Sequence, residues 1–144
     1  MVEINLIRKK GDFGFEAVDQ FGNVACMDTS EESGGVNYGV RPMQMLLMGL
    51  GGCSAIDIVT ILKKQRQHIE DFAIKITGER ESGKEPSLWK EVSIQFILTG
   101  NITSEKAERA VELSMHKYCS VAETLRASGT NLSWEVVVRN GIGL

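Results

Sequence analysis

The sequence predicts an α+β fold in which antiparallel sheets surround a long central helix. Two observations lead to this prediction. Residues 42–67 form the longest stretch with few loop-forming residues, and apolar side chains recur at every second position in short segments on both sides of it. A period of two residues is typical of half-buried strands, whereas a long stretch opened by proline is typical of a helix. At 144 residues, we expect one domain covering 1–144.

The N-terminal third predicts an antiparallel meander. Val2, Ile4 and Leu6 occupy alternate positions, which indicates a half-buried strand, and the glycine-bearing segment 10–14 predicts a hairpin turn. A second strand is expected at 13–17, a turn at 19–23 and a third strand at 24–27. Cys26 lies in the third strand, where we expect it to be a packing residue.

Residues 42–67 predict one helix, with Gly51–Gly52 as the place where it could bend. Pro42 suits the first helical position, and basic residues near the end suit the negative pole of the helix dipole. A thin polar stripe follows one face, formed by Cys53, Asp57, Thr60 and Lys64. Apolar residues cover nearly all other directions, so we expect protein to enclose the helix on almost all sides.

The C-terminal half predicts two strands, two helices and a final strand. Strands are expected at 71–77 and 88–98, with the face of Val92, Ile94, Phe96 and Leu98 turned toward the central helix. Thr103 or Ser104 is expected to cap a helix over 104–118 whose inner face comprises Ala107, Val111, Ser114 and Tyr118. A capping box of Ser120 and Glu123 predicts a second helix over 120–128, and a strand follows at 132–138.

Composition excludes several classes of protein. The net charge is −3 and no basic patch is interleaved with aromatic residues, so we expect no nucleic-acid partner. We find no apolar run of about 18 residues and therefore expect no membrane partner. The alternating N-terminus is unlike a signal peptide, and an odd number of cysteines is unlike a disulfide framework, so a cytoplasmic protein is expected.

Two cysteines share a local pattern of thiol, hydroxyl, two apolar residues and acid, at 53–57 and 119–123. The pattern predicts that each thiol lies by the first turn of a helical segment, where unpaired N–H groups stabilise a thiolate. Asp57 would oppose that effect, so a cation is needed, and Arg8, Lys9, Lys10 and Arg41 are candidates. The alternative is that Cys53 is a buried packing residue.

The spacing of these cysteines gives less support to a zinc site or to a Cys–His nucleophilic pair. Zinc sites usually contain closely spaced cysteine pairs, whereas Cys53 and Cys119 are far apart and only His68 and His116 could complete a set, so no metal and no cofactor are expected. A Cys–His pair of His116 with Cys119 is geometrically open, although the polar neighbours of His116 favour a solvated helix residue.

The segments 42–57 and 117–121 resemble the OsmC/Ohr family of osmotically inducible and organic hydroperoxide resistance proteins, in its YhfA-like branch. The resemblance covers essentially the whole chain. It implies an OsmC-like fold with antiparallel sheets wrapped around long central helices in an intertwined homodimer. It also implies a thiol peroxidase in which Cys53 reacts with a hydroperoxide and Cys119 resolves the sulfenic acid as a disulfide, with a dithiol as reductant.

The sequence departs from the hydroperoxide-reducing branches in both members of an activating pair. Those branches have a glutamate after the proline that opens the central helix, whereas this chain has Met43 and then Gln44. The arginine that pairs with that glutamate has no clear counterpart in this chain. We therefore include Gln44, Arg8 and Arg41 as supporting site residues and keep a second function open. In that alternative, a non-enzymatic dimer binds a hydrophobic small molecule and the cysteines are structural.

Overall fold

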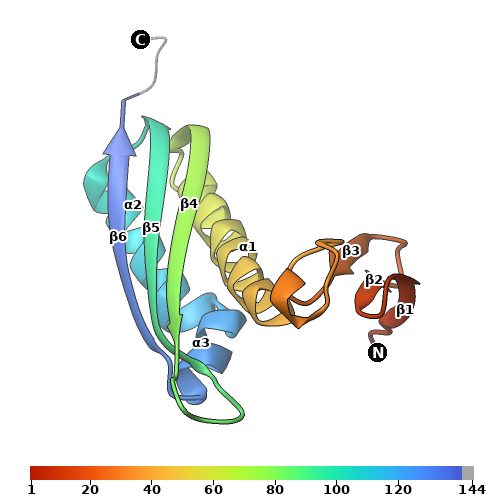
Figure 1. The fold of residues 1–144 in the computed structure, drawn as a ribbon. Helices are drawn as coiled ribbons and strands as arrows, with labels where there is room; N and C mark the ends of the chain where they lie inside the picture. The colour runs from red at the N-terminus through yellow and green to blue at the C-terminus, as the bar shows by residue number, and fades with distance from the viewer. Residues whose placement is uncertain (141–144) are drawn as a thin grey trace. The chain divides into compact units, whose positions relative to one another are not determined.

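The computed structural model describes residues 1–140. They group into two compact units, the first from Met1 to Leu46 and the second beginning at Leu47. The expected order of strands, central helix, paired strands, two helices and final strand is confirmed (Figure 1). That residues 1–144 act as a single domain stays a prediction.

The first unit contains the predicted meander. It is a three-stranded antiparallel sheet in the order β1 (Asn5–Lys10), β2 (Gly14–Val18) and β3 (Val24–Met27). The expected half-burial of the first strand is wrong, because β1 begins at Asn5 and all six of its residues are exposed. Alternation predicts a strand, but burial requires a covering layer. Cys26 is half-buried in β3.

One buried carboxylate organises the loop after β3. Asp28 is 2% exposed, and its side chain accepts hydrogen bonds from the backbone N–H groups of Thr29, Val36 and Tyr38 at 2.7, 2.9 and 3.0 Å. The N–H groups of Tyr38 and Val36 are the main causes that lower the pKa of Asp28. The short turn η1 (Glu31–Ser33) lies within this loop. The chain thus reaches Pro42 along a defined path.

Helix α1 (Pro42–Lys64) is continuous through Gly51–Gly52. It ends before residue 67 because Arg66 adopts a left-handed conformation, with φ of 58°. The single chain covers α1 only in part, so its expected enclosure on almost all sides stays a prediction that requires a partner chain. One face is buried, including Leu50, Ile58 and Leu62, but Met48 is 51% and Ile56 is 69% exposed.

Helix α1 also corrects the expectation that no segment is apolar enough to span a bilayer. Its length and composition meet that criterion, and 22% of its most apolar 18-residue window is buried. The core helix of a soluble protein meets the same criterion, so the finding is weak evidence for a membrane span. Its relevance here is the large apolar surface that α1 leaves exposed.

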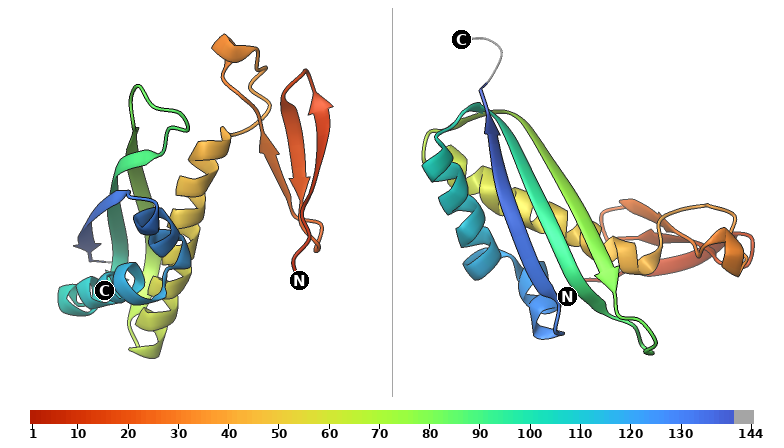
Figure 2. Two further views of the ribbon diagram at one scale, coloured as in Figure 1. Left: turned by 90° about the horizontal axis from the view of Figure 1, so that it is seen from below. Right: turned by 60° about the vertical axis from the view of Figure 1, so that its left-hand side comes forward.

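The second unit is a three-stranded sheet with helices on one face (Figures 1 and 2). Its strands are β4 (His68–Arg80), β5 (Trp89–Asn101) and β6 (Asn131–Arg139). β4 and β5 are antiparallel, as expected, but β6 runs parallel to β5. The sheet is therefore mixed, because the helical segment between β5 and β6 returns the chain to the same end of the sheet.

The sheet has one buried and one polar face, as predicted. Val92, Ile94, Phe96 and Leu98 are at most 2% exposed. On the opposite face, polar side chains of β5 and β6 pair across the strands, as in the hydrogen bond from Gln95 to Glu135. α1 packs closely against β4 at Gly51, where an added Cβ would lie 3.2 Å from Cδ1 of Ile76. This packing fixes α1 against the sheet.

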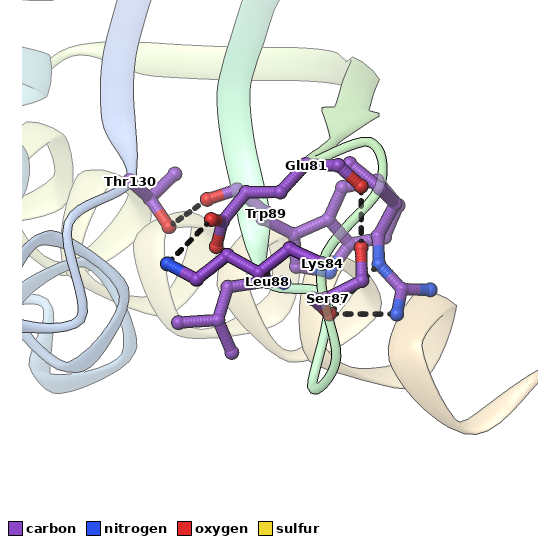
Figure 3. Close-up of polar contacts among 7 residues, drawn as sticks. Glu81, Lys84, Ser87, Leu88, Trp89 and Thr130 are labelled. Atoms are coloured by element: carbon purple, nitrogen blue, oxygen red, sulfur yellow. Dashed lines mark hydrogen bonds and ion pairs between the residues drawn. The ribbon is translucent and has the colours of Figure 1, made fainter.

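The connection between β4 and β5 is held by its own polar groups (Figure 3). Ser87 Oγ donates to the carbonyl of Glu81 at 2.7 Å, and Lys84 forms an ion pair with Glu81 at 3.0 Å. Thr130 Oγ1 donates to the carbonyl of Trp89 at 2.7 Å. The last bond ties the entry of β6 to the start of β5, which sets their parallel register.

Replacing Phe96 with alanine should lower the free energy of unfolding by about 3–5 kcal/mol, because the ring is fully buried and leaves a cavity. Lys90→Ala, on the exposed side of the same strand, should change it by less than about 0.5 kcal/mol. Denaturant unfolding of both variants measures the difference. Equal effects would show that the buried face is not the core.

Candidate functional site

The candidate site begins where the helical segment after β5 changes pitch. Thr103 caps α2 (Ser104–Leu113), its side chain accepting from the N–H of Lys106, as predicted. α2 leads into a π-helical turn, η2 (Ser114–Tyr118), in which the N–H of Cys119 donates to the carbonyl of Ser114 at 2.8 Å. The expected inner-face position of Tyr118 is wrong, because after this wider turn Tyr118 is 49% exposed.

Cys119 itself caps the next helix, α3 (Ser120–Ala127). Its Sγ accepts a hydrogen bond from the N–H of Ala122 at 3.4 Å. The predicted capping box is therefore wrong, since Ser120 is already helical and Glu123 forms an ion pair with Arg126 at 3.0 Å. The Cys119 thiol lies at a helix N-terminus, as expected.

Cys53 occupies a different position from the one expected. It is half-buried at the midpoint of α1 and not near a helix start. In the middle of a helix the backbone N–H groups are bonded to carbonyls one turn earlier, so they are not available to a thiolate. Of the two thiols, only Cys119 therefore accepts a hydrogen bond from the N–H groups at a helix N-terminus.

The fold brings Cys53 and Cys119 together with Asp57. The two Sγ atoms and one carboxylate oxygen of Asp57 all lie within 4.8 Å of one another. Asp57 is one turn after Cys53 on α1, and its Oδ2 accepts a hydrogen bond from Ser114 Oγ at 2.9 Å. Ser114 is fully buried, so this bond fixes η2 against α1. We call Cys53, Asp57 and Cys119 the thiol–carboxylate cluster.

The two thiols of the cluster differ in their access to solvent. Cys119 is 3% exposed, whereas Cys53 is half-buried. Burial, with a smaller contribution from neighbouring Cys53, raises the pKa of Cys119 to about 11. Cys119 is therefore a neutral thiol at pH 7, and Cys53 is the more accessible of the pair.

The polar stripe on α1 lines a cavity. The cavity has a volume of about 410 Å³ and is bordered by Asp57, Thr60 and Lys64 of the stripe, together with Ile61, Gln65, Leu113 and Tyr118. A separate cavity of about 330 Å³ includes Cys119 and His116 in its lining. The ring of His116 packs edge-on against Trp134, with centroids 5.2 Å apart. The stripe is thus polar because it borders open space.

The glycines near Cys53 differ in what they face. Gly51 is in contact with β4, whereas a Cβ on Gly49 or Gly52 would meet nothing within 4 Å among the described residues. Close packing therefore explains one of these glycines. The other two leave open space along α1 beside the thiol.

The supporting residues predicted from sequence all lie in the first unit. Arg8 is exposed on β1, and Gln44 is exposed in the first turn of α1. Arg41 donates from Nη1 to the carbonyl of Gly39 at 3.2 Å and to Asn37 Oδ1 at 3.4 Å. Their role at Cys53 stays a prediction.

The joint role of Asp57 and Ser114 is not apparent from the sequence. Along the chain, Asp57 belongs to the polar stripe as a group that opposes a thiolate, and Ser114 belongs to the inner face of a helix. A hydroxyl among apolar inner-face residues was the available signal, because a buried hydroxyl requires a hydrogen-bond partner. Its partner is 57 residues away in sequence and could be identified only from the fold.

The chain belongs to the OsmC-like protein family, whose profile matches residues 33–135. It is 48% identical over 98 residues to the protein YhfA of Escherichia coli K12, an alignment covering 67% of this chain and 72% of YhfA. This similarity confirms the predicted YhfA-like branch.

Solved structures of similar fold agree with this assignment. A hypothetical protein of Aquifex aeolicus is 31% identical with a TM-score of 0.79, covering 96% of this chain and 98% of that one. A Legionella pneumophila protein described as an organic hydroperoxide resistance protein OsmC is 17% identical with a TM-score of 0.68 and 96% coverage of both chains. At this lower identity the likeness shows the fold alone.

Alkylation of Cys119 by iodoacetamide should be half-maximal near pH 11 in the folded protein and near pH 9 in denaturant. The thiolate is the reacting form and burial disfavours it, so the rate should rise with pH later when the protein is folded. Peptide mass spectrometry reports each cysteine separately. Equal pH profiles in the two states would contradict the burial of this thiol.

Proposed function

We propose that this protein is a thiol-dependent peroxidase that reduces organic hydroperoxides in oxidative stress defence. The observation that supports this proposal most directly is the approach of Cys53 to Cys119 within 4.8 Å. Two thiols at that distance can form a disulfide after a small movement. Membership of the OsmC-like family also supports the proposal, because proteins described as hydroperoxide resistance proteins share this fold.

The first step assigns attack to Cys53, the more accessible thiol. The Cys53 thiolate attacks one peroxide oxygen, the O–O bond breaks, and the other oxygen takes up a proton and leaves as the alcohol. Cys53 becomes a sulfenic acid. Our candidates for the cation that favours the thiolate are Arg41 and Arg8, with Arg8 delivered in trans by the second chain of the homodimer proposed below. Gln44 is our candidate for a polar contact with the peroxide.

The second step requires a proton acceptor, because burial keeps Cys119 protonated. Cys119 attacks the Cys53 sulfur, an S–S bond forms, and the sulfenic hydroxyl leaves as water. The carboxylate of Asp57 lies within 4.8 Å of both sulfurs and is oriented by Ser114. We assign Asp57 the transfer of the Cys119 proton to the departing hydroxyl. A dithiol reductant then restores both thiols by exchange.

Cys53→Ser should abolish hydroperoxide consumption in an assay supplied with a dithiol, since the attacking sulfur is lost. Cys119→Ser should leave the first step intact and accumulate a sulfenic acid that dimedone labels. Asp57→Asn should slow disulfide formation by about 10²-fold or more but spare sulfenic acid formation. Cys26→Ser is the matched control and should behave as wild type.

These variants separate the steps of the mechanism. Unchanged turnover in Cys53→Ser would refute the peroxidase proposal. Fast disulfide formation in Asp57→Asn would remove only the proposed role of Asp57. The reaction is followed by single-turnover quenching and mass spectrometry of the 53–119 disulfide.

We also propose an obligate C2 homodimer in the cytoplasm. Several apolar side chains of α1 are exposed in the single chain, including Leu46, Met48 and Ile56, and exposed apolar side chains gathered on one helix are typical of a protein–protein contact surface. The open space at Gly49 and Gly52 on the same helix would allow close approach of a second chain. The free cysteines suit a reducing compartment.

Light scattering should give about twice 15.9 kDa at micromolar concentration, and the unfolding midpoint should rise with protein concentration. Ile56→Lys places a charge on the exposed face of α1 and should dissociate the dimer. Glu108→Lys on the exposed face of α2 is the control. A folded wild-type species near 16 kDa would contradict the proposal.

The second candidate function is a dimer that binds a hydrophobic small molecule without chemistry. The observation favouring it is the cavity of about 410 Å³, whose lining includes the apolar side chains of Ile61 and Leu113 and the ring of Tyr118. The iodoacetamide titration distinguishes the two functions at Cys53. Reaction of Cys53 well below pH 8 supports the peroxidase, and slow reaction across that range supports the binding protein.

A further inference from the structure

The thiol–carboxylate cluster has the donor atoms of a metal site. Two Sγ atoms and one carboxylate oxygen lie within 4.8 Å of one another. Cys53 and Cys119 are far apart in sequence, but closely spaced cysteines are needed only where one local loop supplies the zinc ligands. Here α1 delivers two ligands one turn apart, and the start of α3 delivers the third.

The donor types favour Zn²⁺. Thiolates select soft or borderline cations, and two thiolates with one carboxylate exclude Mg²⁺ and Ca²⁺, which prefer oxygen ligands alone. Zinc binds sulfur at about 2.3 Å and carboxylate oxygen at about 2.0–2.2 Å, so tetrahedral binding places the sulfurs about 3.8 Å apart. The ligand atoms already lie within 4.8 Å of one another, so the distance between the two sulfurs needs to shorten by only about 1 Å.

Two neighbouring groups hold the ligands in place. Ser114 Oγ donates to Oδ2 of Asp57, which orients the carboxylate and leaves its other oxygen for a cation. The N–H of Ala122 donates to Cys119 Sγ at 3.4 Å, which directs that sulfur. Such outer contacts typically contribute about 10–100-fold to metal affinity.

Space for a fourth ligand is present beside the cluster. Asp57 lines the cavity of about 410 Å³, which is large enough for a water molecule or a small ligand. Neither histidine belongs to the cluster among the described residues. Three protein ligands with an open fourth position are typical of zinc sites that exchange ligands.

We propose that Cys53, Asp57 and Cys119 form a three-ligand Zn²⁺ site with one open coordination position. Binding of the ion does not depend on the peroxidase proposal. One consequence does: the sulfur lone pairs that bind Zn²⁺ are those that attack peroxide, so Zn²⁺ and hydroperoxide are mutually exclusive at Cys53 and the metal inhibits turnover reversibly.

Competition with a chromophoric chelator, using the reduced full-length chain and Zn²⁺ alone, tests the site. One Zn²⁺ per chain should bind in wild type and in Cys26→Ser. Cys53→Ser and Cys119→Ser should each lose this binding. Asp57→Asn and Ser114→Ala should weaken it by about 10-fold or more. Circular dichroism checks that each variant is folded.

A second measurement needs no variant. Zn²⁺ should slow alkylation of Cys53 and Cys119 in wild type, while Cys26 stays unprotected, and a strong chelator should restore the rates. Binding that survives in both Cys53→Ser and Cys119→Ser, or equal protection of all three cysteines, would overturn the site. Full affinity in Asp57→Asn would overturn the three-ligand assignment. Because no peroxide is present, these results do not depend on whether the protein is a peroxidase.

Discussion

The hydrogen bond from Ser114 to Asp57 is the constraint on which the candidate site depends. It joins the π-helical turn after α2 to the middle of α1, and both groups lie next to a cysteine of the cluster. The wider turn ends α2, and the N–H of Cys119 closes it on the carbonyl of Ser114. Arg126 donates to the carbonyl of Met115 at 2.8 Å and so ties α3 back to the same turn. Cys119 is therefore held at a helix start that faces α1.

This arrangement places the carboxylate of Asp57 beside both thiols, in the middle of α1 and away from Met43, where the hydroperoxide-reducing branches are expected to have their glutamate. A carboxylate beside a thiol opposes the thiolate, which would hinder attack on a peroxide. The same carboxylate can accept the proton of a buried second thiol, or share a divalent cation with both sulfurs. The cluster is thus suited to transfer of the Cys119 proton, or to binding a cation that neutralises the negative charge of its ligands.

Within the second unit, the sheet covers one side of α1, the helix that contains Cys53 and Asp57. Its sheet buries the face of Phe96 and holds α1 through the contact of Gly51 with Ile76. The opposite side of α1 presents apolar residues to solvent, with Ile56 69% exposed. The same helix contains Cys53, so a chain that covered this apolar surface would also lie near the site. A second chain covering α1 would decide which groups reach the half-buried thiol.

Local periodicity, capping residues and two motifs are readable along the chain, and they predict the order of elements, the buried face of β5, the cap at Thr103 and the family. The two motifs also contain Cys53 and Cys119. Four other features become visible only in the fold. Cys53 lies mid-helix, Cys119 rather than Ser120 caps α3, β6 is parallel to β5, and Asp57 lies close to both thiols. Cys53 lies mid-helix because α1 continues through Gly51–Gly52. The other features depend on a π-helical turn and on contacts between residues 40 or more positions apart, for which a local pattern has no signal.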